Sequence, residues 1–172
     1  MPDGILGRVE RAIGVLLDPI LAVVRGAVIA LAAGIVLVIF IQVILRYVFN
    51  SAFFGAEELA KFMFTWLIFL GATVALDRGM HFSVDTIVAK LPAPLMRLAF
   101  VAAQGFVLMV LGILVVKGTQ LAMLNWRQLS PALQVPITIP YAAIPTAAAL
   151  MILVSARRFC RIVMRANPFA PD

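Results

Sequence analysis

Four long apolar stretches, each closed by charged or strongly polar residues, set the fold of this 172-residue chain. A helix needs about 20 apolar residues to cross the roughly 30 Å hydrocarbon core of a bilayer. Hydrophobic residues make up 64% of the chain and charged residues only 13%, so the surface of an ordinary water-soluble domain cannot be built from it. The sequence therefore predicts an all-α integral membrane protein with four transmembrane helices, at residues 26–45, 57–76, 95–116 and 137–154.

Two of these spans have irregular ends. The second is uncharged only from Phe62 to Leu76, so its helix has to begin near Glu57. In the fourth, Pro145 frees the carbonyl group of Tyr141, which predicts a kink against neighbouring protein. The third helix is expected to continue beyond the bilayer from residue 117 to 129, where Ser130-Pro131 ends it.

Two amphipathic segments are predicted to lie flat in the membrane interface. Within residues 1–25, apolar side chains recur every three or four positions among charged ones, which is typical of an interfacial helix and not of a cleaved signal peptide. A second, shorter interfacial helix is expected at residues 83–91, between spans two and three. The cytoplasmic tail is expected to begin at residue 155.

The basic residues predict the orientation. Ten of the fourteen Lys and Arg residues fall in the N-terminal segment, the loop between spans two and three, and the C-terminal tail, whereas four fall on the other side. Because short cytoplasmic loops are enriched in basic residues, both termini are expected in the cytoplasm. The net charge of +6 therefore indicates topology, and nucleic acid is not an expected partner.

Nothing in the sequence indicates an enzyme or a cofactor. The single cysteine, Cys160, excludes an intrachain disulfide, and the single histidine, His81, excludes a bis-histidine haem. His81 lies four residues after Asp77 and four before Asp85, so we expect a local hydrogen-bonded cluster with Arg78 and no metal site.

Adjacent acids at the start of the second span, Glu57 and Glu58, are the most informative polar pair. They could complement the helix dipole, one of them could form an ion pair with a partner chain, or one could bind a coupling ion. Because adjacent helical residues point in different directions, they cannot share one small site. Arg46 could extend to the headgroups or contact these acids.

The remaining polar and aromatic residues favour helix packing. Gln104 is predicted to hydrogen-bond between helices. Trp66 is predicted to pack within the protein or against lipid, and Trp126 and Tyr141 fit the interfacial aromatic belt.

Several short motifs occur in a characteristic order. This pattern resembles the small permease subunits of tripartite ATP-independent periplasmic (TRAP) transporters over residues 25–158, although Phe54-Gly55-Ala56 departs from the family's usual Trp and small polar residue. The motifs are Arg46 to Asn50, Glu57-Glu58-Leu59, Trp66, Phe69-Leu70-Gly71, Gly79-Met80-His81, Val84-Asp85, Leu91-Pro92, Ser130-Pro131-Ala132-Leu133 and Ile139-Pro140-Tyr141.

The resemblance implies a three-part importer in the bacterial inner membrane. In such systems a periplasmic binding protein captures an organic acid, and a large membrane subunit carries the substrate and sodium sites. The small subunit, surrounded by membrane lipids, would brace the large one. The alternatives are a self-sufficient oligomeric transporter or channel with Glu58 as coupling acid, and a membrane anchor of a redox enzyme.

Overall fold

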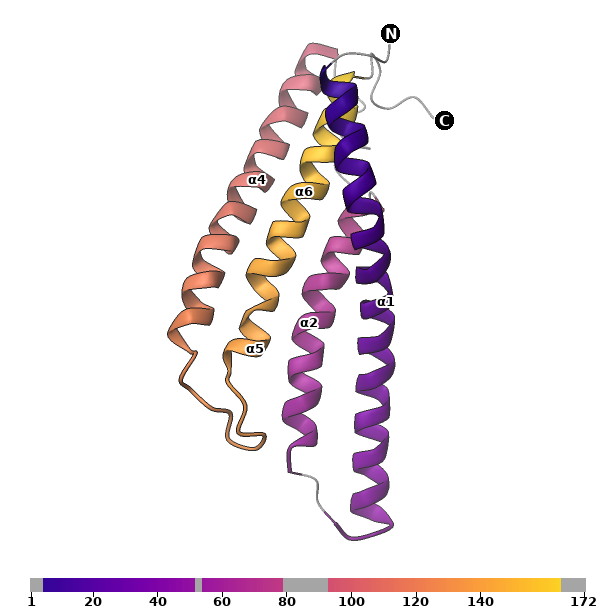
Figure 1. Cartoon of the computed structure of the whole chain (residues 1–172), viewed down its shortest axis with the longest axis vertical. Helices are drawn as coiled ribbons and strands as arrows, with labels where there is room; N and C mark the ends of the chain where they lie inside the picture. Colours follow the sequence, from indigo (N-terminus) through magenta and orange to yellow (C-terminus); the bar gives the residue numbers. More distant parts are fainter. Residues whose placement is uncertain (1–4, 52–53, 79–92, 165–172) are drawn as a thin grey trace.

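The computed structural model describes residues 5–51, 54–78 and 93–164, in which four long helices form an elongated bundle (Figure 1). Four helices are long and apolar enough to cross a membrane, at Leu17–Tyr47, Ala56–Asp77, Val101–Leu124 and Thr138–Arg157. The predicted all-α fold with four transmembrane helices is therefore confirmed. The helical elements are α1 (Ile5–Tyr47), α2 (Ala56–Asp77), α4 (Ala93–Leu124), α5 (Thr138–Tyr141) and α6 (Ala143–Met164).

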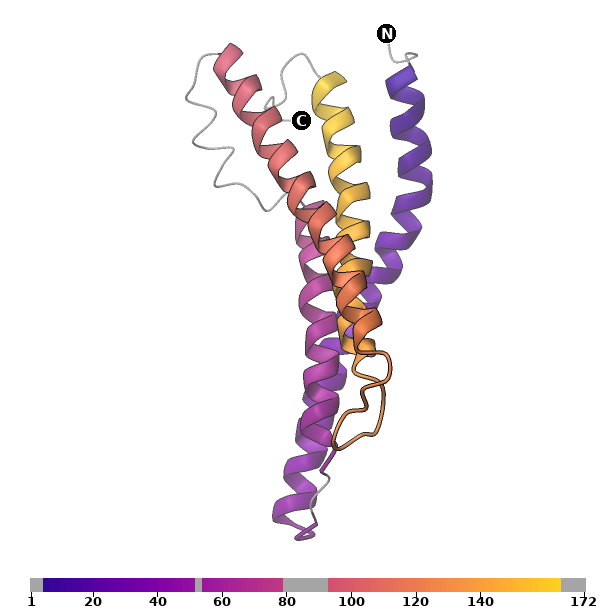
Figure 2. The same cartoon turned by 90° about the vertical axis from the view of Figure 1, so that its left-hand side faces the viewer.

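Successive long helices run in opposite directions, which gives the bundle two distinct ends (Figure 1). The start of α1, the start of α4 and the end of α6 lie at one end, here called the terminal end. The segments that connect α1 to α2 and α4 to α5 lie at the other end, called the loop end. Figure 2 shows that α1 diverges from α4 and α6 toward the terminal end.

The first helix differs from the prediction, because α1 is one helix of 43 residues and not an interfacial helix followed by a separate span. At 1.5 Å per residue it is about 65 Å long, well beyond the thickness of a bilayer core. Pro19 lies inside it without ending it. Packing explains this continuity, since Leu17 and Leu21 are only 2% and 1% exposed. The predicted interfacial helix at 83–91 lies outside the described residues.

The chain's apolar core lies toward the terminal end, where α1, α2 and α6 meet. Leu17, Leu21, Leu76 and Val154 form it, with Met151 packed against them. Two ion pairs join the same helices: Arg25 contacts Asp77 at 3.1 Å, and Arg157 contacts Asp18. Charges that would otherwise interrupt a membrane helix are thus partly neutralised by neighbouring helices.

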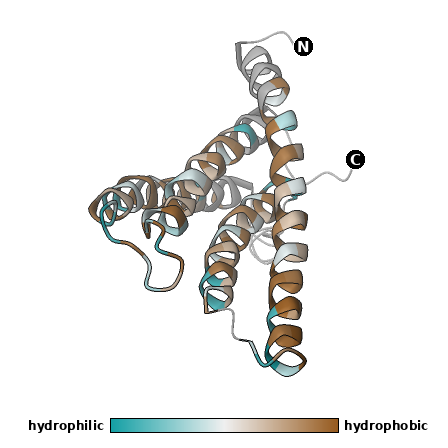
Figure 3. Cartoon of the chain, turned by 60° about the horizontal axis from the view of Figure 1, so that its bottom comes forward, coloured by the Kyte–Doolittle hydropathy of each residue, from teal (hydrophilic) through white to brown (hydrophobic). Residues whose placement is uncertain are grey.

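Beyond this core, the apolar span of α1 is almost unburied. No residue in its most hydrophobic window is buried inside the chain, and Figure 3 shows hydrophobic residues around α1 toward the loop end. This surface is left for lipid or for another protein.

The ends of the last two spans also differ from the prediction. The helix α4 ends at Leu124, before residue 129, and α6 continues through residue 155 to Met164. The fourth span is divided at Ala142, three residues before the expected kink at Pro145. The carbonyl of Ala142 accepts hydrogen bonds from the backbone N–H and the hydroxyl of Thr146, at 3.3 and 2.7 Å. Proline removes one helical hydrogen-bond donor, and the helix is interrupted in the turn that precedes Pro145.

A glycine brings α4 and α6 close together. A Cβ atom added at Gly118 would lie 2.9 Å from Cγ2 of Ile144 and 3.2 Å from the backbone nitrogen of Pro145. Gly112, six residues earlier on α4, has nothing within 4 Å of such an atom. The two glycines are therefore a matched pair for testing this contact.

We expect Gly118→Ala to lower the free energy of unfolding by about 1–3 kcal/mol through overpacking. Gly112→Ala should be neutral or should raise it by roughly 0.5–1 kcal/mol, because alanine favours helix. Unfolding of both variants in detergent, followed by circular dichroism, measures the difference. Equal stability of the two would mean that α4 and α6 are not in contact at Gly118.

Candidate functional site

Residues 128–137, which connect α4 to α5, form a small hairpin at the loop end. The N–H of Ser130 donates to the carbonyl of Val135 at 2.8 Å, and the N–H of Ile137 donates to Gln128 at 2.9 Å. At the tip the N–H of Gln134 donates to the carbonyl of Ser130 at 3.1 Å, which closes a single helical turn. Gln134 then takes a φ of 55°, in the left-handed region, and reverses the chain.

The helical turn at this tip leaves amide groups without backbone acceptors. Ser130 stands at the N-cap position and Pro131 follows at the first helical position, where its missing N–H costs nothing. The next two amides, of Ala132 and Leu133, need acceptors. A serine in this position commonly supplies one with its hydroxyl, but Oγ of Ser130 is buried and has no partner among the described residues.

Glu58 supplies the missing acceptor from the first turn of α2. Its Oε2 atom accepts hydrogen bonds from the N–H of Ala132 at 3.0 Å and of Leu133 at 2.8 Å. Bonds between a carboxylate and backbone amides are charge-assisted, and a negative charge also complements the dipole of the turn. The carboxylate of Glu58 therefore caps a turn 74 residues away in sequence.

The neighbouring acid has a different environment. Glu57 is exposed and makes no hydrogen bond with another described residue, whereas Glu58 is half-buried. Arg46 is exposed and takes part in neither ion pair of the described residues. The structure thus brings Glu58 together with Ser130-Pro131, which we had singled out separately, and does not join either acid to Arg46.

Two further side chains hold the short α5 helix. The indole N–H of Trp66 in α2 donates to the carbonyl of Ile139 at 3.1 Å. The hydroxyl of Thr138 donates to the carbonyl of Ala122 in α4 at 2.6 Å. Trp66 was expected to pack against protein or lipid, and the structure adds a specific hydrogen bond to that role.

The remaining predicted polar residues lie nearer the terminal end. Gln104 donates to the carbonyl of Ser155 at 3.4 Å, which confirms its inter-helix hydrogen bond. Arg78 is exposed just after α2, and Asp77 pairs with Arg25. His81 and Asp85 lie outside the described residues. Within the described ranges, no three His, Cys, Asp or Glu residues are placed to hold a metal ion.

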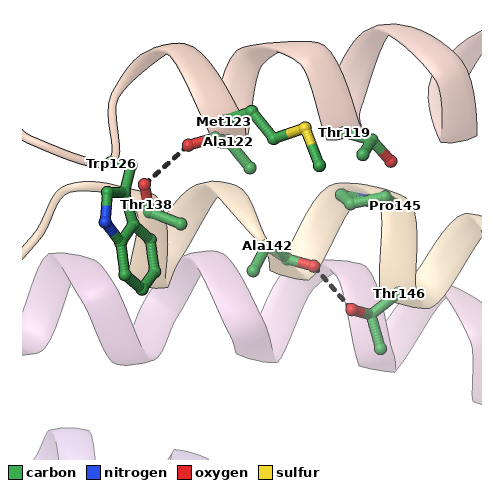
Figure 4. Close-up of a pocket in the computed structure, with 8 residues that line it drawn as sticks. All are labelled: Thr119, Ala122, Met123, Trp126, Thr138, Ala142, Pro145 and Thr146. Carbon is green, nitrogen blue, oxygen red and sulfur yellow. Dashed lines mark hydrogen bonds between the residues drawn. The ribbon is translucent and has the colours of Figure 1, made fainter.

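A groove of about 530 Å³ follows the seam between α4 and the α5–α6 segment (Figure 4). Sequence reasoning did not identify it, because it arises from the division of the fourth span at Ala142. Its lining residues are Thr119, Ala122, Met123, Trp126, Thr138, Ala142, Pro145 and Thr146.

Four spanning helices, with polar side chains that join helix to helix and hold the hairpin, define a multi-pass membrane protein. Residues 35–165 match the family model described as tripartite ATP-independent periplasmic transporters, DctQ component. The chain therefore belongs to the DctQ family of TRAP transporter small permease components.

Individual relatives agree with this assignment. A Haemophilus influenzae protein described as a TRAP transporter small permease protein is 32% identical over 136 residues, which cover 78% of this chain and 82% of that protein. The C4-dicarboxylate TRAP transporter small permease protein DctQ of Rhodobacter capsulatus is 31% identical over 98 residues, 56% of this chain and 43% of that protein.

A third relative is much longer than this chain. The isethionate TRAP transporter permease protein DctMQ of Oleidesulfovibrio alaskensis is 31% identical over 132 residues, 70% of this chain but only 21% of that protein. These relatives are transporter components and not enzymes.

Replacing Glu58 by glutamine should lower the free energy of unfolding by about 1–3 kcal/mol, since the amides of Ala132, which is exposed, and Leu133, which is partly buried, lose a charged acceptor. Glu57→Gln is the matched control in the same helical turn. Its loss should be at most roughly 0.3–1 kcal/mol, from the weaker dipole interaction. Thermal unfolding of both variants in one detergent compares them. Equal losses would contradict a specific role for Glu58.

Proposed function

We propose that this chain is the scaffold subunit of a TRAP-type importer and that it braces a large membrane subunit. The main support is that polar side chains of this chain bond to its own backbone. Glu58, Trp66, Gln104 and Thr138 all bond to backbone groups of this chain, so they hold its helices in place. Side chains engaged in this way are not free to bind and release a solute.

The surface of α1 supports the same role. Its span is the most hydrophobic of the four and is unburied within the chain, which leaves a broad apolar face for a partner in the membrane. This chain matches only about a fifth of the DctMQ relative, which is a permease protein. The much longer remainder of that relative supports a larger membrane partner for this chain. We infer that the partner is the large TRAP membrane subunit, with a periplasmic substrate-binding protein as third component.

The transported solute would be an organic acid, driven by an ion gradient such as that of sodium. The names of relatives support this class, because they include C4-dicarboxylate and isethionate transporters. The alternative of a self-sufficient transporter has less support, because its coupling acid would be Glu58, whose carboxylate already accepts two backbone hydrogen bonds.

Transport should require this chain even though it carries no substrate site. Proteoliposomes with the large subunit and the binding protein alone are expected to take up substrate poorly, and addition of this chain should restore uptake. This chain alone should give no uptake. Full uptake without it would exclude a scaffold role, and uptake by it alone would favour the self-sufficient transporter.

We further propose that the protein lies in the bacterial inner membrane with the terminal end in the cytoplasm, as the basic residues indicate. In a chain in which Cys160 is replaced by alanine, cysteines at the exposed positions Ser51 and Gln134 should react with a membrane-impermeant thiol reagent applied to spheroplasts. A cysteine at position 83 should react only after lysis. The buried Ser130 is unsuited as a reporter. Labelling at position 83 in intact spheroplasts would contradict this orientation and indicate the opposite one.

A further inference from the structure

We propose that the groove between α4 and the α5–α6 segment binds one acyl chain of a phospholipid whose headgroup lies beside Trp126. The groove lies on two helices that are long and apolar enough to span a membrane: Thr119 and Ala122 belong to one, and Ala142 and Thr146 to the other. It is open at its edge, where Met123 and Trp126 are 73% and 66% exposed. The edge at Met123, inside the span, therefore faces hydrocarbon, and Trp126 lies just beyond the end of the span at Leu124.

The hydroxyl groups in the groove do not call for a polar ligand. Thr119 donates to the carbonyl of Val115 at 2.7 Å, Thr138 to Ala122 at 2.6 Å and Thr146 to Ala142 at 2.7 Å. Figure 4 shows two of these bonds, which turn the hydroxyls of Thr138 and Thr146 toward the backbone. With the hydroxyl protons used in this way, the wall is suited to an apolar occupant.

The end of the groove at the loop is different in character. Trp126 lies there, and its indole N–H makes no hydrogen bond with another described residue, in contrast to that of Trp66. Arg127 follows it, is exposed, and takes part in neither ion pair of the described residues. An indole donor and a positive charge complement the phosphate and ester groups of a lipid, and tryptophan is enriched at this depth in membranes.

The apolar wall and the polar end of the groove together favour a phospholipid over a helix of a partner protein. An occupant has to be apolar along Ala122, Ala142 and Pro145, and anionic or rich in acceptors beside Trp126, which the exposed Arg127 follows in the chain. Every phospholipid molecule combines an apolar acyl chain with a headgroup that carries a phosphate and ester acceptors. The bound chain would fill the space left where the fourth span divides at Ala142, and so would seal the seam between α4 and α6.

The proposal is tested by filling the groove with an indole. Thr146 is exposed and its hydroxyl bonds only to the carbonyl of Ala142, four residues earlier in the chain, so Thr146→Trp fills the groove with little other change. Ile113→Trp is the matched control, because Ile113 is 52% exposed on α4 and does not line the groove. Each purified chain is exchanged repeatedly into lipid-free detergent, and the retained phospholipid is measured by native mass spectrometry.

The original chain and Ile113→Trp should retain a single phospholipid, and Thr146→Trp should retain roughly tenfold less, because the indole excludes several methylene groups. Arg127→Gln should reduce retention of phosphatidylglycerol more than of phosphatidylethanolamine. Circular dichroism and thermal unfolding establish that the variants are folded. If Thr146→Trp does not fold, Thr119→Phe fills the groove from the opposite wall.

Equal retention by the groove-filling variant and the control would overturn the proposal, as would an original chain that loses all phospholipid. A variant that keeps its lipid but no longer co-purifies with the large subunit would show that the groove receives protein instead. The phospholipid measurement needs only this chain, and only the co-purification needs the large subunit, so the lipid result does not depend on whether the scaffold role is correct.

Discussion

The two hydrogen bonds from the amides of Ala132 and Leu133 to the carboxylate of Glu58 are the interaction on which the loop end depends. Backbone amides that the fold shields from water are costly without acceptors, so a non-helical connection packed against protein needs partners within the protein. The hairpin at 128–137 satisfies part of its backbone internally. Glu58 accepts hydrogen bonds from the amides of Ala132 and Leu133, which have no backbone acceptor within the hairpin.

The same constraint explains why α2 has a central place in the bundle. Its first turn holds the hairpin through Glu58, its middle holds α5 through Trp66, and its end joins α1 through Asp77 and the core through Leu76. The side chain of Thr138 then connects α5 to α4. A helix with polar contacts along its whole length fixes the positions of its neighbours, which is the property expected of a rigid support.

The four spans could be predicted because hydropathy over about 20 residues reflects the bilayer directly. The single α1 helix could not, because Asp18 and Arg25 look like interruptions until Arg157 and Asp77 are placed beside them. Glu58 and Ser130-Pro131 were both identified as informative, but their contact was not, since the acceptor meets backbone amides that carry no sequence signature. The groove likewise depends on where the last span divides, and the position of Pro145 alone does not determine this.

Hydrogen exchange at the hairpin measures the central interaction most directly. In deuterated buffer with mild detergent, the amides of Ala132 and Leu133 should exchange as slowly as those of the hydrogen-bonded hairpin residues Ser130 and Ile137. In Glu58→Gln the two tip amides should exchange much faster, and those of α4 should not change. Exchange of Ala132 and Leu133 at the rate of an unstructured peptide in the original chain would contradict the account, because it would mean that Glu58 does not hold the hairpin.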